Sequence, residues 1–431
     1  MNYQQTIGYL YSQLPMFHRI GPPAYKASLD NIVILSQHLG NPHHHFPTIH
    51  IAGTNGKGSV AHMMAAILRE QGYKTGLATS PHLKDYRERI RINGQMIPRK
   101  VVSSFVTRHQ DLFEQIKPSF FELTIALTFW YFADRQVDIA VVETGLGGRL
   151  DSTNIILPEL SIITNIGLDH VNLLGDTLEK IAREKAGIIK EGVPVVIGRR
   201  QQQIHHVFEE MAAAKRSPVF VAPDNYQFMK SSEGLTAGQM LQELSYKTAE
   251  GEIVVHSDLL GASQPENVAT VLQGIDVLNA GGRFSVSEDN VLKALTKVSV
   301  ATGLKGRWQV LGHNPAIICD TAHNTDGVAM VMERLLTIPF RQLHIVFGMV
   351  DDKEIDSVLA LMPDFASYYF CKPDVPRGKD AKQLADHAAA FGLNGEVFDS
   401  VPQALKQARE AAQPNDLIYV GGSTFVVAEV V

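Results

Sequence analysis

Short apolar runs alternate with amphipathic helical segments along most of the chain. In its first part, runs rich in β-branched residues predict strands at 48–52, 138–142, 160–164 and 194–197. Helices are predicted between or after them, at 59–71, 176–189 and 266–278. This alternation is typical of a parallel sheet with helices on both faces. Residues 226–256 depart from it, because apolar and polar positions alternate there around predicted turns at 232–234 and 250–251, and we expect a β-hairpin appendage.

A second unit of the same kind begins near Trp308. Its predicted strands are 316–319, 343–347, 368–371 and 417–420, and its predicted helices include 327–336 and 401–411. We place the join within 298–306, which contains Thr302-Gly303 and Lys305-Gly306. The sequence therefore predicts an α/β fold with two domains. A larger N-terminal, P-loop-type domain with a mostly parallel sheet spans residues 1–297, and a smaller C-terminal, Rossmann-like α/β domain spans residues 298–431.

The strongest local signal is the glycine-rich turn Gly53-Thr-Asn-Gly-Lys-Gly-Ser59, which joins the first strand to a helix. Glycines let backbone N–H groups curl around phosphate oxygens, and the helix N-terminus adds a favourable dipole. Lys57 would reach the β- and γ-phosphates, and the hydroxyl of Ser59 would approach Mg²⁺. The expected cofactor contacts are Asn55, Gly56, Lys57, Gly58 and Ser59. The turn departs from the standard phosphate loop at Ala52 and at the inserted Gly58, and alone it indicates only that a nucleotide binds.

Two other predicted strands end in segments with charged or ligating side chains. Glu143 opens the segment Glu143-Thr-Gly-Leu-Gly-Gly-Arg-Leu-Asp151, beyond the carboxyl end of a strand, where chemistry is found in open α/β sheets. Glu143 is placed like a metal carboxylate, whereas Asp151 is either a second functional carboxylate or a helix cap. His170 follows the 160–164 strand as a candidate Mg²⁺ ligand, although Mg²⁺ usually prefers oxygen. A structural histidine is the alternative.

Lys185 falls on the apolar face of the helix predicted at 176–189, whose start resembles a capping box at Asp176 and Glu179. Burying a bare ammonium group is costly unless it is paired or neutralised. The spacing alone therefore favours a lysine that reaches to the helix edge. The alternative is a lysine converted to a carbamate, which would be an anion useful near Mg²⁺.

Composition excludes several classes of protein. The chain has 431 residues, of which 45% are hydrophobic and 19% charged, as in a globular protein of two or three domains. A net charge of -6 without a basic run argues against a nucleic-acid partner. Neither a signal-peptide core nor an apolar run of membrane-spanning length is present. Cys319 and Cys371 are expected to be buried, reduced thiols. We expect a cytoplasmic protein without a membrane partner.

Taken in order, the motifs resemble the folylpolyglutamate synthase/dihydrofolate synthase family, relatives of the Mur ligases. The resemblance runs through nearly the whole chain. Its motifs are Arg19-Ile-Gly-Pro with Tyr25-Lys-Ala-Ser-Leu-Asp, Leu39-Gly-Asn-Pro, the 53–59 turn, Thr79-Ser-Pro-His-Leu83, Arg87-Glu-Arg-Ile-Arg-Ile-Asn93, Phe120-Phe-Glu-Leu-Thr124, the 143–151 and 164–170 segments, and Glu184-Lys-Ala-Gly-Ile188. Departures are Ser263, where many relatives have histidine, and Thr321 and Thr325 in Asp320-Thr-Ala-His-Asn-Thr325.

The resemblance implies roles for individual residues. It implies two Mg²⁺ ions, with the ligands Ser80, Glu143 and His170 and with Ser59 near the nucleotide-bound metal. Lys185 would be the carbamylated lysine, and Asn267, Arg307 and Asp320 would contact ATP. The catalytic residues would be Lys57, Asp151, Lys185 and His323. The pterin-bearing substrate would lie near Pro81, His82 and Phe121.

The activity implied by the resemblance is ATP-dependent addition of L-glutamate to dihydropteroate, to the γ-carboxylate of a reduced folate, or to both, by a monomer. ATP would phosphorylate the acceptor carboxylate, and the amine of glutamate would displace phosphate from the acyl phosphate. A Mur-type ligase for a peptidoglycan precursor is one alternative, against which the segments 79–83 and 120–124 argue. A nucleotide-binding switch module would need no second catalytic domain, and a small-molecule kinase would form no amide.

Overall fold

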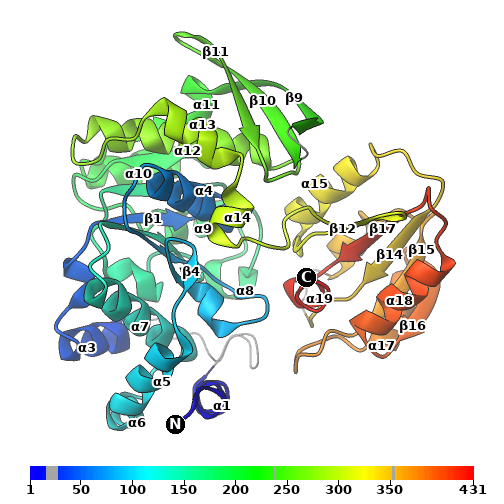
Figure 1. Cartoon of the computed structure of the whole chain (residues 1–431), viewed down its shortest axis with the longest axis horizontal. Helices are drawn as coiled ribbons and strands as arrows, with labels where there is room; N and C mark the ends of the chain where they lie inside the picture. Colours follow the sequence, from blue (N-terminus) through cyan, green and yellow to red (C-terminus); the bar gives the residue numbers. More distant parts are fainter. Residues whose placement is uncertain (16–27, 237–238, 352–354) are drawn as a thin grey trace. The chain divides into compact units, whose positions relative to one another are not determined.

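The computed structural model describes residues 1–15, 28–236, 239–351 and 355–431, and the chain divides into two compact units (Figure 1). The first comprises Met1–Leu259 and Gln264–Leu304, and the second comprises Leu260–Ser263 and Lys305–Val431. The units therefore join after Leu304, which is later than the predicted boundary between residues 297 and 298. Helix α14 (Val298–Thr302) belongs with the first unit, because Thr302 Oγ1 of α14 forms a hydrogen bond of 2.7 Å with His62 Nδ1 of α4 (Lys57–Glu70). The motif at 19–22 and the first half of the one at 25–30 (residues 25–27) lie outside the described residues.

An eight-stranded sheet forms the centre of the first unit, in the order β4-β3-β2-β5-β1-β6-β7-β8. Its parallel strands are β1 (Thr48–Ala52), β2 (Thr75–Ala78), β5 (Ile139–Glu143), β6 (Leu160–Ile163), β7 (Val195–Ile197) and β8 (Val219–Val221). β3 (Ile90–Ile92) and β4 (Gln95–Met96) add an antiparallel edge. The predicted mostly parallel sheet is therefore confirmed. Its strands are near-continuous apolar runs because both faces are covered.

Helices cover the two faces because successive residues of a strand point to opposite sides. Ile49 and Ile51 pack against a layer that includes α4, α12 (Gln264–Ala280) and α13 (Glu288–Leu295). The opposite face carries two further groups of helices. They are α1 (Tyr3–Gln13), α3 (Asp30–His38), α5 (Arg99–Arg108), α6 (Gln110–Ile116) and α7 (Phe120–Asp134) in one group, and α9 (Leu178–Ala186) and α10 (His205–Ala214) in the other. Short helical turns complete the unit, namely η2 (Pro42–His44), η3 (Tyr86–Arg89), η4 (Ser152–Ile155), α8 (Val171–Leu174) and α11 (Ala222–Asn225).

The appendage of the first unit is a three-stranded antiparallel sheet, not a hairpin (Figure 1). Its strands are β9 (Gln227–Thr236), β10 (Gln239–Thr248) and β11 (Gly251–Ser257). The turn predicted at 232–234 is wrong, because these residues lie inside β9 and pair with β10. Leu244 and Tyr246 of β10 join the main core, and the Tyr246 hydroxyl donates to the Pro265 carbonyl at 2.7 Å.

The second unit has a six-stranded sheet in the order β12-β13-β17-β14-β15-β16. Its strands are β12 (Gln309–His313), β13 (Ala316–Cys319), β14 (Leu343–Phe347), β15 (Ser367–Cys371), β16 (Gly395–Phe398) and β17 (Leu417–Gly421). β12 is antiparallel to β13, and the other pairs are parallel. One face is covered by α15 (Thr325–Leu335), α16 (Ile355–Leu359) and α17 (Ala381–Ala389), and the other by α18 (Val401–Ala411) and α19 (Thr424–Ala428). The predicted second α/β unit is confirmed.

Two predictions from composition can be compared with the fold. Cys319 and Cys371 are buried and free, as expected. Among the described residues, no helix is both long enough and apolar enough to cross a membrane.

Candidate functional site

The turn between β1 and α4 can be built only with glycine at two positions. Gly53 has φ +147°, and a Cβ there would lie 1.8 Å from Thr164 Oγ1. Gly56 has φ +82°, and a Cβ there would lie 2.4 Å from Asn267 Oδ1. L-residues rarely adopt these conformations, and neither position has room for a side chain. The backbone thus curls tightly at the start of α4, with the predicted nucleotide contact Asn267 beside it.

The segment that follows β6 holds this turn in place. Thr54 N donates to the Asn165 carbonyl at 2.8 Å, and Asn55 N donates to Asn165 Oδ1 at 2.9 Å. Thr164 Oγ1 donates to the Asn55 carbonyl at 2.6 Å, and Thr54 Oγ1 bonds to Gly167. These supports are not among the predicted contacts, although Thr164, Asn165 and Gly167 stand in the 164–170 motif.

Two lysines converge on this turn. Lys57 Nζ donates to the carbonyls of Gly53 and Thr54 at 2.9 and 3.0 Å, and Lys185 Nζ donates to the Gly53 carbonyl at 2.8 Å. Lys185 is only 4% exposed, so the interpretation that it reaches the helix edge is wrong. Burial, and to a smaller extent the charge of Lys57, lowers the pKa of Lys185 to about 7. The charges of Asp169 and Asp151 act in the opposite direction and raise this pKa. Lys57 thus brings positive charge to the turn where a phosphate would bind, while the lowered pKa of Lys185 favours its neutral amine.

The start of α9, the helix that carries Lys185, differs from the prediction. The N-cap is Thr177, whose hydroxyl accepts from Lys180 N at 3.2 Å. Asp176 instead accepts from Lys180 Nζ at 2.7 Å, and Glu179 pairs with Arg183. The predicted capping box at Asp176 and Glu179 is therefore wrong, because the threonine one residue later takes the capping position.

Glu143 and Ser80 meet at the same edge of the sheet. Glu143 ends β5 and stands beside Ile51 of β1 in the parallel register, so the segments that carry Lys57 and Glu143 leave neighbouring strands. Ser80 follows β2, on the other side of β5, and its backbone N donates to Glu143 Oε2 at 3.2 Å. The Ser80–Pro81 peptide is cis. Two of the predicted metal ligands are thus brought together, with the glutamate 5% exposed.

Asp151 closes the 143–151 segment on itself. Its Oδ2 accepts from the backbone N atoms of Gly145 and Leu146 at 2.9 and 2.8 Å, and its Oδ1 accepts from Thr153 N and Oγ1 at 3.0 and 2.5 Å. It is the N-cap of η4, one of its two predicted interpretations. Burial raises its pKa, against these hydrogen bonds. This segment packs closely against α9, because a Cβ at Gly148 would lie 2.8 Å from the Lys185 carbonyl oxygen.

His170 lies beyond the carboxyl end of β6, at the N-cap of α8, with φ +51°. Its Nε2 is 3.7 Å from Asp169 Oδ1. Within the described residues there is no group of three or more His, Cys, Asp and Glu side chains that could hold a metal. The expected ligand set has a different composition, since it combines a serine with Glu143 and His170.

The predicted acceptor side also lies in the first unit. His82 Nδ1 accepts from Arg89 Nε at 2.7 Å, and His82 Nε2 lies 3.1 Å from the Tyr11 hydroxyl. Phe121, near the start of α7, covers the 143–151 segment, since a Cβ at Gly145 would lie 2.5 Å from its ring. Pro81 is exposed beside them. Arg89, which stands in the 87–93 motif, is therefore an unpredicted partner of His82.

In the second unit, Asp320 follows β13 and organises the next turn. Its Oδ2 accepts from Trp308 N at 2.7 Å and its Oδ1 from Ala322 N at 2.8 Å. Burial raises the pKa of Asp320, and the charge of Arg307 opposes this. His323 Nδ1 lies 3.0 Å from the Thr321 carbonyl. Arg307, Asp320 and His323 thus gather at one edge of this unit.

Comparison with known proteins identifies both halves of the chain. Residues 51–273 match the Mur ligase middle domain, and residues 306–424 match the Mur ligase, glutamate ligase domain. The dihydrofolate synthase/folylpolyglutamate synthase of Bacillus subtilis is 32% identical over 416 residues, which cover 94% of each chain. A probable bifunctional folylpolyglutamate synthase/dihydropteroate synthase of Haloferax volcanii is 35% identical over 437 residues. The alignment covers all of this chain but only 50% of that relative.

Solved structures agree with these matches. E. coli FolC in complex with DHPP and ADP has a TM-score of 0.83 at 29% identity, with 100% of this chain and 97% of that one covered. A bifunctional folylpolyglutamate synthase/dihydrofolate synthase with Mn, AMPPNP and L-glutamate bound has a TM-score of 0.82 at 27% identity and the same coverage. The chain therefore belongs to the folylpolyglutamate synthase/dihydrofolate synthase family of the Mur ligase superfamily.

Proposed function

We propose that this chain is an ATP-dependent ligase that joins L-glutamate both to dihydropteroate and to the γ-carboxylate of a reduced folate. The observation that carries the proposal is the convergence of Lys57 and Lys185 on the Gly53 carbonyl, at the edge of the sheet where Glu143 also lies. The Bacillus subtilis relative, matched over almost its full length, is named for both activities.

The chemistry has to convert a poor leaving group into a good one. A carboxylate oxygen of the acceptor attacks the γ-phosphorus of ATP, the bond to the β-phosphate oxygen breaks, and ADP leaves. The amine of glutamate, after losing a proton, then attacks the acyl carbon and expels phosphate. Lys57 Nζ donates to two backbone carbonyls of the turn, so its ammonium group can turn onto the transferring phosphoryl oxygens and balance their charge.

The donor atoms at this edge fit a magnesium ion. Mg²⁺ prefers oxygen ligands, and the Glu143 carboxylate and Ser80 are in hydrogen-bond contact there. We propose that Ser80, Glu143 and His170 hold one ion and that Ser59, in the first turn of α4, holds a second with the nucleotide. When bound, Mg²⁺ supplies positive charge that offsets the charge of the phosphoryl oxygens.

We further propose that Lys185 is carbamylated. The nitrogen of a neutral amine bonds to the carbon of CO₂ and releases a proton, and a pKa of about 7 leaves a large neutral fraction at neutral pH. The product is an anion, which removes the repulsion with Lys57 and relieves the buried cation.

The remaining residues are assigned by position. We propose that Asp151 acts as a positioning residue that fixes the 143–151 segment, and that Pro81, His82 and Phe121 contact the pterin-bearing acceptor. Asn267 would contact the nucleotide, and Arg307, Asp320 and His323 are the proposed contributors from the second unit. The free buried thiols support a cytoplasmic location, and we propose a monomer.

The test is ADP release measured with L-glutamate and either dihydropteroate or a reduced folate monoglutamate. The proposal predicts ADP release that needs both the acceptor and glutamate, with one amide formed per ADP. ADP release with a phosphorylated product and no amide would indicate a kinase instead. Activity with only one of the two acceptors would show that the chain has a single glutamate-adding activity and is not bifunctional.

A further inference from the structure

His50 is a buried histidine to which the proposed mechanism gives no role. It lies in the middle of β1, where it pairs with Val142 of β5 and Ser161 of β6, and it is 0% exposed. Ile49 and Ile51 point to the face of the sheet that α4 covers, so the ring of His50 points to the opposite face. A titratable side chain at such a position needs a hydrogen-bond partner.

The His50 ring is joined to Asp151 through one hydroxyl group. His50 Nε2 lies 2.8 Å from Thr153 Oγ1, and Thr153 Oγ1 in turn bonds to Asp151 Oδ1 at 2.5 Å. Burial, and to a smaller extent the charge of Lys190, lowers the pKa of His50 to about 3. The ring is therefore neutral and carries a single proton, on one of its two nitrogen atoms.

Two arrangements of protons fit these distances. In the first, His50 Nε2 carries the ring proton and donates to Thr153, and the Thr153 hydroxyl donates to an Asp151 carboxylate. In the second, every bond is reversed. A protonated Asp151 donates to Thr153, the Thr153 hydroxyl donates to His50 Nε2, and the ring proton lies on Nδ1. The two arrangements differ in the charge of Asp151.

The surroundings of the ring favour the first arrangement. In the described part of the chain, His50 Nδ1 is buried and has no hydrogen-bond partner. A buried N–H group without an acceptor is rare in proteins, whereas a lone pair without a donor is tolerated more often. The ring proton therefore belongs on Nε2, where Thr153 Oγ1 accepts it.

The surroundings of the carboxyl group favour the same arrangement. Besides the Thr153 hydroxyl, Asp151 accepts from the backbone N atoms of Gly145, Leu146 and Thr153 at 2.9, 2.8 and 3.0 Å. Four donors thus converge on its two oxygen atoms, and hydrogen bonds of this kind favour the charged form of a carboxyl group. The Thr153 hydroxyl can be the fourth donor only if its oxygen accepts from His50.

We propose that His50 is a positioning residue for the acceptor site, because its Nε2–H fixes the direction of the Thr153 hydroxyl and so holds Asp151 in place. The proposal rests on the proposed function, which assigns Asp151 to fixing the 143–151 segment and Phe121 to the acceptor. The Phe121 ring covers Gly145, one of the two residues whose N–H groups Asp151 holds. His50 itself touches no substrate and acts only through Thr153.

The first measurement uses the wild-type protein and does not depend on activity. Nitrogen-15 NMR of histidine-labelled protein distinguishes ring nitrogens that carry a proton from those that do not, and His50→Gln identifies the signals of His50. From about pH 6 to 8, we expect a proton on Nε2 and none on Nδ1. A proton on Nδ1 would overturn the proposal, whether or not the protein ligates glutamate.

A double-mutant cycle tests whether His50 acts through Thr153. Thr153→Val removes the hydroxyl at similar volume and should raise the KM for dihydropteroate about tenfold, whereas His50→Leu should raise it about threefold. The double variant should have the KM of Thr153→Val, because without the hydroxyl the ring has nothing to orient. Thr153→Ser and His50→Gln keep a hydroxyl and an N–H donor, and their KM should stay within about twofold of wild type. The KM for ATP should not change in any variant.

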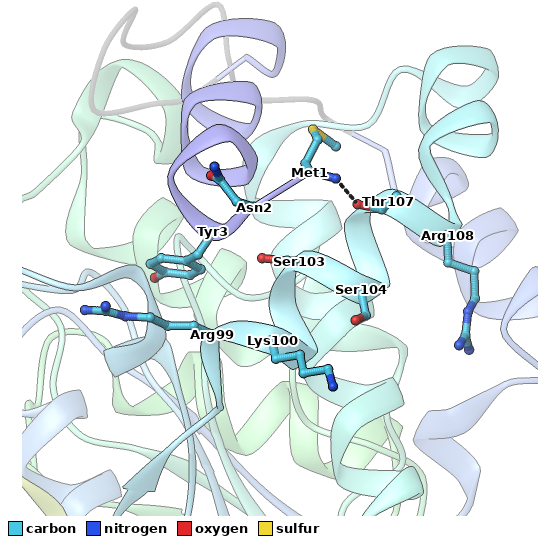
Figure 2. A pocket seen from close by; sticks show the side chains of 9 residues that line it. All are labelled: Met1, Asn2, Tyr3, Arg99, Lys100, Ser103, Ser104, Thr107 and Arg108. Atoms are coloured by element: carbon cyan, nitrogen blue, oxygen red, sulfur yellow. Dashed lines mark hydrogen bonds between the residues drawn. The ribbon is translucent and has the colours of Figure 1, made fainter.

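Two other threonines provide matched controls. Thr128→Val removes a buried hydroxyl that donates to the Thr124 carbonyl at 2.7 Å within α7. Thr107→Val removes an exposed hydroxyl at the cavity between α1 and α5, where it accepts from Met1 N at 3.1 Å (Figure 2). We expect Thr128→Val to lower the melting temperature about as much as Thr153→Val does, but neither control should change the KM for dihydropteroate.

Hydrogen exchange separates this proposal from the proposed function. The amides of Gly145 and Leu146 should exchange faster in Thr153→Val and in His50→Leu than in wild type or in the two controls. In an active enzyme, unchanged exchange of these amides, or KM effects that add in the double variant, would overturn the positioning role alone. The expected ring proton and exchange rates in a protein that ligates no acceptor would instead refute the proposed function and support the hydrogen-bonded chain.

Discussion

Lys57 and Lys185 donate to one and the same carbonyl oxygen, that of Gly53, at 2.9 and 2.8 Å. One lysine begins α4 and the other lies near the end of α9, so two distant segments present ammonium groups to one point. Two neighbouring cations repel each other, and this repulsion, together with burial, lowers the pKa of Lys185 to about 7. The fold therefore favours a Lys185 that is neutral, or converted to an anion, beside the charged Lys57.

The first prediction concerns pH and CO₂. The amine of Lys185 is charged below its pKa of about 7 and neutral above it, and only the neutral amine reacts with CO₂. We expect turnover to fall as the pH decreases through about 7, to be low in CO₂-depleted buffer, and to recover when bicarbonate is added. Initial rates across the pH range, with and without bicarbonate, measure this.

The matched variant is Lys185→Met, which removes the amine but fills a similar buried volume. We expect wild type incubated with carbon-13 bicarbonate to give a carbamate signal in the NMR spectrum that this variant lacks. Identical spectra, or full activity of wild type without CO₂, would show that Lys185 acts as an amine.

The second prediction separates Lys57 from an ordinary surface lysine. Lys57→Ala should lower kcat/KM at least about 100-fold, since one charge-stabilising donor contributes about 3 kcal/mol to a transition state. Lys180→Ala removes an exposed lysine paired with Asp176 and should leave turnover unchanged. Steady-state kinetics with varied ATP provide the comparison, and a Lys57→Ala enzyme with wild-type kcat would exclude the assigned role.

Part of this fold follows from local pattern. The predicted strands at 48–52, 316–319 and 343–347 coincide with β1, β13 and β14, because buried parallel strands appear as short apolar runs. The helix at 401–411 likewise coincides with α18, which begins at a serine cap with proline in its first turn. Glycine and apolar spacing therefore located most elements near the site.

The local pattern of apolar and polar residues does not predict the order of the strands in the sheet. The bonds from Thr54 and Asn55 to Asn165 exist because β1 and β6 are neighbours in the sheet, and no local spacing indicates that. Helical spacing put Lys185 on an apolar face but could not decide whether its amine reached water. That depended on the Gly53 carbonyl, far away in the sequence.

The third prediction tests the tight turn itself. Gly53→Ala places a methyl group 1.8 Å from Thr164 Oγ1 at φ +147°, and should destabilise the protein by about 2 kcal/mol or more and abolish nucleotide binding. Gly72→Ala is the control, since its φ is +105° but nothing lies within 4 Å, and it should cost about 1 kcal/mol. Urea unfolding and nucleotide titration measure both effects. Equal losses in the two variants would show that the contact with Thr164 is unimportant.

The fourth prediction concerns recognition of the acceptor. Phe121 lies over Gly145, and removing its ring should raise the KM for dihydropteroate about tenfold, as expected for the loss of a partly buried aromatic contact. The KM for ATP should not change. Phe365→Ala, at a phenylalanine that is 61% exposed in the second unit, should leave both KM values unchanged. A Phe121→Ala enzyme that is affected only in its KM for ATP would place this ring on the nucleotide side.

The most direct test of the central claim follows one oxygen atom. Dihydropteroate labelled with oxygen-18 in its carboxylate is incubated with ATP, L-glutamate and the enzyme, and the released phosphate is examined by mass spectrometry. If the carboxylate attacks the γ-phosphorus, one labelled oxygen appears in phosphate for each amide formed. Amide formation with unlabelled phosphate would contradict an acyl phosphate, and with it the role assigned to Lys57.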